Sequence, residues 1–98
     1  MSMLPIQYRD FHDFPRAFII EHEGHGYFFD CPFDVDLDDY PDHFRIYQMD
    51  LRRVRAIGAG SWEGLAAEGK LVGQAPTHLV RFDPTQRAAV DDAVLKLI

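Results

Sequence analysis

The chain has 98 residues, 47% of them hydrophobic, and its 16 acidic and 10 basic side chains give a net charge of −6. This length predicts a single domain over residues 1–98, since two separate cores would each be too small to offset chain entropy. The negative charge excludes nucleic acid and acidic membrane surfaces as expected partners.

Cysteine usage and apolar runs indicate the compartment. Cys31 is the one cysteine, so no internal disulfide can form, which fits a reducing cytosol. The longest apolar run, residues 17–20, is far shorter than the roughly 18–20 residues needed to cross a bilayer. The amino terminus lacks the basic-then-apolar pattern of a signal peptide. We therefore expect an unexported, cytoplasmic protein.

A β-hairpin is the first predicted element. Residues 16–23 and 27–31 are rich in aromatic and β-branched side chains and flank a glycine-containing turn. A two-residue turn at Gly24-His25 would pair Ile20 with Phe29. Alternation along the strands then predicts a core face and an opposite face. The core face is Phe18, Ile20, Tyr27, Phe29 and Cys31, and the opposite face is Ile19, Glu21, Phe28 and Asp30.

Four further segments follow in the chain. Residues 43–50 alternate apolar and polar side chains and predict a third strand, antiparallel to its neighbour. Residues 51–58 suit a strand or a helical turn, and we favour irregular structure or strand. Residues 61–69 predict a short helix, capped by Ser61 and ended by Gly69. Residues 77–82 predict a last strand.

Residues 83–98 carry the signals of an amphipathic helix. Asp83 suits the N-cap, Pro84 the first helical position and Gln86 the capping box. Apolar residues recur at helical spacing, namely Ala89, Val90, Ala93, Val94 and Leu97. The predicted fold is therefore α+β: a small, mostly antiparallel sheet of three to five strands with an N-terminal β-hairpin, one short helix and a C-terminal amphipathic helix packed on the sheet.

The segment 30–42 holds six acids and no base. Aspartates at alternate positions suggest a calcium loop, but Asp39 stands where an EF-hand needs glycine and Arg45 where it needs glutamate. A looser divalent-cation site, a solvated loop and a partner-facing surface remain as alternatives. The residues that we assign to partner binding are Phe33, Asp34, Asp36, Asp38, Asp39, Tyr40 and Asp42.

The sequence gives weaker signals for two other chemistries, a zinc-type site and a cysteine nucleophile. His22, His25 and Asp30 could form a zinc-type site, but histidines three apart suit a helix better than a turn. In the predicted register Cys31 lies four residues along the strand from His22, about 13 Å, too far for a cysteine–histidine nucleophile. A cysteine on the core face is the simpler interpretation.

The sequence favours a binding protein without a cofactor over an enzyme. Our first hypothesis is an interaction protein that uses residues 30–42 against a basic protein partner. The second is a metal-binding protein or metal-dependent enzyme that uses His22 and His25 with nearby carboxylates. A homodimer formed through an exposed strand edge is compatible with either.

Overall fold

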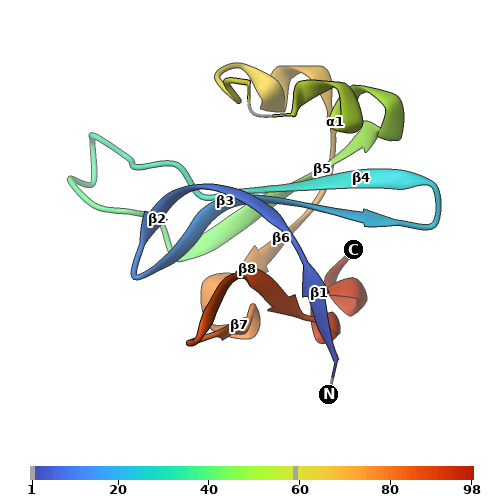
Figure 1. Ribbon diagram of the computed structural model, residues 1–98. Helices are drawn as coiled ribbons and strands as arrows, with labels where there is room; N and C mark the ends of the chain where they lie inside the picture. The colour runs from blue at the N-terminus through green and yellow to red at the C-terminus, as the bar shows by residue number, and fades with distance from the viewer. Residues whose placement is uncertain (1, 59) are drawn as a thin grey trace.

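The computed structural model describes residues 2–58 and 60–98, and its centre is a five-stranded sheet (Figure 1). Every strand pairs antiparallel with the strand that precedes it in the sheet, which confirms the predicted antiparallel character. In order, the strands are β2 (Gln7–His12), β3 (Phe14–His22), β4 (His25–Asp30), β5 (His43–Asp50) and β6 (Lys70–Pro76).

Smaller elements cover both faces of this sheet, so the α+β fold has three layers (Figure 1). One face carries a three-stranded sheet in the order β1 (Met3–Pro5), β8 (Gln86–Asp91), β7 (Phe82–Asp83). The other face carries the helix α1 (Leu51–Ile57) and the 3-10 helix η1 (Leu65–Glu68). The remaining 3-10 helices are η2 (Thr77–Leu79) and η3 (Asp92–Leu97).

Each face of the large sheet has its own hydrophobic core. The predicted core face is correct, since Phe18, Ile20, Tyr27, Phe29 and Cys31 all pack toward the small sheet. The opposite face is buried as well, because α1 and the segment after it cover it. The second core contains Ala17, Ile19, Phe28, Met49, Val54, Ile57, Trp62 and Leu65.

The β3–β4 turn lies one residue earlier than the predicted Gly24-His25. Its central residues are Glu23 and Gly24, with φ values of 50° and 80°, and His22 pairs with His25. The predicted pairing of Ile20 with Phe29 is therefore wrong. Each residue's partner moves by two positions, and a shift of two keeps every side chain on its predicted face. A type I′ turn explains the choice, because it requires positive φ at both central residues.

The helices in the middle of the chain differ from those predicted: one forms where none was predicted, and the predicted one is shorter than expected. Residues 51–57 form α1, not irregular structure or strand, and the Asp50 carboxylate caps it by accepting the Arg52 N–H at 2.8 Å. The predicted helix over 61–69 shrinks to η1. Ser61 Oγ accepts the Glu63 N–H at 3.1 Å and thus supports the turn before η1.

The predicted strand over 77–82 and the predicted helix over 83–98 are wrong. The strand lies earlier, at β6, and the last residues form β7, β8 and η3. Asp83 Oδ1 accepts the Thr85 N–H at 2.7 Å, so this aspartate closes the β7–β8 turn. Aspartate followed by proline starts turns as readily as helices. Pairing of β8 with β1, far away in the sequence, decides between them.

Candidate functional site

The connection from β4 to β5, residues 31–42, is the acidic loop, and it projects beyond the end of the large sheet, at the left of Figure 1. A short antiparallel bridge braces it, with the Asp34 N–H donating to the Asp39 carbonyl at 2.9 Å. Asp34 Oδ1 also accepts the N–H groups of Asp36 and Leu37, at 2.9 and 3.3 Å. The first aspartate of the loop therefore shapes its backbone.

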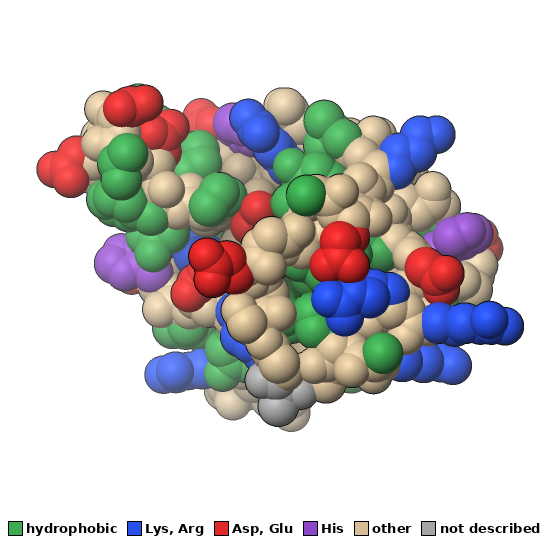
Figure 2. All heavy atoms as spheres, turned by 90° about the horizontal axis from the view of Figure 1, so that it is seen from above, with side chains coloured by type: hydrophobic (Ala, Val, Ile, Leu, Met, Phe, Trp, Pro, Cys, Tyr) green, Lys and Arg blue, Asp and Glu red, His purple; other side chains and the backbone are tan. Residues whose placement is uncertain are grey.

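Large apolar side chains are exposed on the acidic loop between its carboxylates. Val35 is 80% exposed, Leu37 61% and Phe33 48%. Figure 2 shows hydrophobic and acidic side chains interleaved on this projection, at the upper left of the view. The sequence carried this signal as valine and leucine alternating with aspartates, but the assigned surface included only Phe33 and Tyr40 among the apolar residues.

An arginine from β3 anchors the base of the acidic loop. The Arg16 guanidinium lies between the rings of Phe14 and Tyr40, 3.9 and 4.3 Å from their centroids. Its Nε donates to the His12 carbonyl at 3.0 Å, and its Nη1 lies 3.8 Å from Cys31 Sγ. The Tyr40 ring in turn stacks on the His12 ring at 5.1 Å. Sequence patterns missed Arg16 and His12, because their contacts cross from one strand pair to a distant loop.

Cys31 closes the same base from inside the core. Its side chain is fully buried, and its Sγ lies 3.4 Å from the Pro41 carbonyl oxygen, which the thiol can reach as a donor. Burial raises the pKa of the Cys31 thiol, while the hydrogen bond with Arg16 opposes that rise. A buried thiol with a raised pKa is a poor nucleophile, so Cys31 has a structural role.

The loop carboxylates have separate local contacts. Asp39 Oδ1 accepts the Tyr40 N–H at 2.7 Å, and Asp42 Oδ1 lies 3.2 Å from His43 Nδ1. Asp36 and Asp38 are exposed. Over residues 2–58 and 60–98, no three His, Cys, Asp or Glu side chains are grouped so that they could hold a metal ion.

The residues of the alternative zinc-type site are divided between the two ends of β4. His22 and His25 face each other across the β3–β4 turn. Asp30 is five residues farther along, about 17 Å at the rise of a strand, and pairs with Ala17 and Arg45. The structure thus brings the two histidines together and separates Asp30 from them.

Asp30 instead lies at the base of the acidic loop. Its carboxyl is half-buried, and burial raises its pKa above the ordinary value of 3.8. The negative charge of Asp10 adds to that rise, and the positive charge of Arg45 opposes it. Asp30 takes part in none of the ion pairs found in the described part of the chain.

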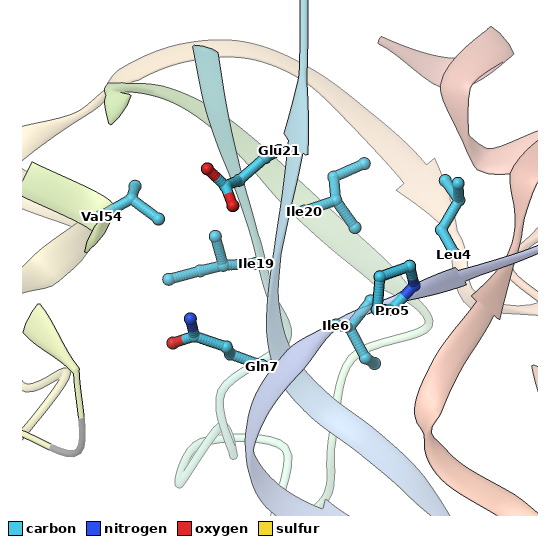
Figure 3. Close-up of a pocket in the computed structure, with 8 residues that line it drawn as sticks. All are labelled: Leu4, Pro5, Ile6, Gln7, Ile19, Ile20, Glu21 and Val54. Carbon is cyan, nitrogen blue, oxygen red and sulfur yellow. The ribbon is translucent and has the colours of Figure 1, made fainter. Parts of the chain in front are cut away.

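A separate cleft of about 210 Å³ lies beside β3, where the chain leaves β1 and enters β2 (Figure 3). In Figure 3, Ile19, Ile20 and Glu21 lie between the β1–β2 junction and Val54 of α1. The Glu21 carboxylate already accepts from Arg55 Nε at 2.8 Å. The cleft is a consequence of the switch between sheets, and its carboxylate is occupied.

No protein-family model, curated protein or solved structure matches this chain. The acidic loop and its base are therefore the grounds for assigning a function. Among the described residues, no helix is both long and apolar enough to span a membrane.

Proposed function

We propose that this is a small acidic interaction protein that binds a basic protein partner through the acidic loop. The observation that carries the proposal is the exposure of Val35 and Leu37, at 80% and 61%, on a projecting loop among carboxylates. Such a mixed surface offers burial of apolar area together with attraction to positive charge. The lone buried Cys31 agrees with the cytoplasmic setting that the proposal assumes.

The apolar side chains would supply affinity, and the carboxylates would supply rate and selectivity. Complete burial of a leucine or valine side chain contributes about 1.5–3 kcal/mol. Exposed carboxylates contribute less to affinity but steer a positive partner toward the loop, and this effect weakens as salt screens it. A stable complex would need more area than the loop alone, about 1,000 Å² or more, so neighbouring surface must contribute.

The rigid base of the loop supports this role. Arg16, Tyr40 and His12 form a continuous stack beneath the loop, and the Phe33 ring packs edge-on against Tyr40 at 5.4 Å. A loop held in one shape loses less conformational entropy when a partner binds it. The exposed apolar groups are thus presented on a pre-organised support.

A direct test is affinity capture of the partner, followed by measurement of its affinity and association rate with the purified partner. Leu37→Ser should weaken binding by roughly fivefold to thirtyfold, because it removes about 1–2 kcal/mol of apolar burial. Leu79→Ser is the matched control, since Leu79 is 47% exposed on η2, outside the loop. Asp36→Asn with Asp38→Asn should lower the association rate at 50 mM salt and have little effect at 500 mM.

Two results would overturn the proposal. One is a captured partner that binds the Leu37→Ser and Leu79→Ser variants equally well. The other is an affinity that is the same at 50 mM and 500 mM salt, together with an association rate that the two aspartate substitutions leave unchanged.

A homodimer is a second candidate, and strand β6 favours it. β6 is an edge of the five-stranded sheet, and its Leu71 and Val72 are 53% and 41% exposed. An unpaired strand edge can pair with a second copy of itself. Light scattering on the eluted protein would give twice the chain mass, and Val72→Pro would return it to the monomer mass. A monomer at high micromolar concentration would exclude this pairing.

A further inference from the structure

A cavity of about 310 Å³ lies between the acidic loop and the large sheet. Asp30 and Arg45 line it from the sheet, and Phe33, Val35 and Pro41 line it from the loop. By strand alternation Asp30 shares its face with Phe28, so the cavity opens on the side of the sheet that carries α1. Its volume is at the lower end of the range for ligand pockets, enough for one long side chain.

Asp30 is the carboxylate that this cavity offers to a ligand. Asp34 also lines the cavity, but its Oδ1 is occupied by the N–H groups of Asp36 and Leu37. Arg45 is directly opposite Asp30 in the β4–β5 pairing, yet the two form no ion pair within the described residues. A half-buried carboxylate without an ion-pair partner is costly to keep charged, and a guanidinium that donates to it gains more than it would at an exposed acid.

We propose that this cavity receives an arginine side chain of the protein partner, with Asp30 as its counter-ion and Phe33 as its apolar wall. This inference rests on the proposed function and specifies the chemistry of the partner. A planar guanidinium can lie against a ring and donate edge-on to a carboxylate, which a lysine ammonium cannot do. The protein already places guanidinium groups on rings within its own fold, for Arg16 on Phe14, Arg9 on Trp62 and Arg87 on Phe11.

Other ligand classes suit the cavity less well. Asp30 and Asp34 disfavour an anion. The described residues also contain no group of three side chains arranged to hold a metal. The apolar loop wall adds contact area for the methylene groups of a long basic side chain.

The experiment uses the complete chain and a small probe, N-acetyl-arginine methylamide, titrated to millimolar concentration in an NMR experiment on backbone amides. We expect saturable shifts at Asp30, Phe33 and His43, all of which line the cavity. The neutral isostere N-acetyl-citrulline methylamide should produce none of them. The lysine analogue should bind more weakly than the arginine probe.

A matched pair of variants tests the role of Asp30. Asp30→Asn should weaken the arginine probe about tenfold, the effect of losing one charge-assisted hydrogen bond. Asp38→Asn removes the same charge from the loop but outside the cavity, and should change probe affinity less than twofold. The bound probe should also lower the pKa of Asp30, whose titratable and charged neighbours are Asp10, Asp34, His43 and Arg45.

Three results would overturn the inference: equal shifts with the citrulline probe, unchanged affinity in Asp30→Asn, or equal losses in Asp30→Asn and Asp38→Asn. The last would show a general effect of the acidic field. The proposed function fails separately, if Leu37→Ser leaves the affinity for the partner unchanged. If the partner's affinity depends on Leu37 but the arginine probe's affinity does not depend on Asp30, the acidic loop would still be the binding surface and the cavity would not be part of it.

Discussion

Replacement of Arg16 by alanine should destabilise the whole fold as well as the base of the acidic loop. Arg16 is 9% exposed, and no carboxylate lies within ion-pair distance of it among the described residues. Its positive charge is therefore held by the Phe14 and Tyr40 rings and by the His12 carbonyl. Arg16→Ala removes all three contacts at once.

The expected loss follows from those contacts. A hydrogen bond from a charged donor contributes about 1.5–3 kcal/mol, and each guanidinium–ring contact about 0.5–2 kcal/mol. Removal of the arginine also relieves the cost of burying its charge, and this relief offsets part of the lost stability. We expect a net loss of about 2–3 kcal/mol in the free energy of unfolding. For a chain of this size the melting temperature should then fall by roughly 8–24 °C.

The assay is urea unfolding, in which the midpoint should fall while the slope stays constant. Arg16→Lys is the matched variant, because it keeps the charge but loses both the planar stacking and the Nε bond; it should lose about half as much. A double-mutant cycle with Tyr40→Leu isolates the ring contact and should give a coupling of about 1 kcal/mol. A loss below about 0.5 kcal/mol in Arg16→Ala, within the range of ordinary surface changes, would refute this account of the loop base.

Three further predictions concern Gly26, Asp30 and Cys31. A Cβ on Gly26 would collide with Val54 Cγ2, so Gly26→Ala should lower the free energy of unfolding by about 1–3 kcal/mol. The double variant Gly26→Ala with Val54→Ala should regain most of that loss. The raised pKa of Asp30 makes its protonated form stabilising; this contribution is complete below the ordinary value of 3.8 and is lost as pH rises through the raised pKa. Asp30→Asn should therefore be more stable than the parent at pH 7 and show a flatter dependence of unfolding free energy on pH, whereas a less stable variant would contradict the sign. Because Cys31 is fully buried and its pKa is raised, a thiol reagent at pH 8 should modify the folded protein far more slowly than the urea-unfolded chain. Equal rates of modification would contradict this and show that the base of the acidic loop opens.

The candidate site was only partly predictable from the sequence. The concentration of six acids in residues 30–42 is a property of the sequence, and it pointed to the loop that projects from the large sheet. The support beneath that loop is a contact between Arg16 and Tyr40, 24 positions apart by their residue numbers, and no local pattern encodes it. The structure separates Asp30 from His22 and His25, because Asp30 lies at one end of β4 and His25 lies at the other, opposite His22 of β3.

Residue alternation by itself determined the core face of β3, β4 and β5, since successive side chains on a strand point to opposite faces regardless of the exact turn. That is why a turn misplaced by one residue still left Phe18 and Phe29 on the correct face. The tertiary structure alone decided the carboxy-terminal segment. The Asp83-Pro84 signal suits a helix start and a turn equally, and pairing of Val90 with Leu4 of β1 selected the strand. Local propensities differ by only about a kilocalorie per mole, which burial of one side chain between distant strands can exceed.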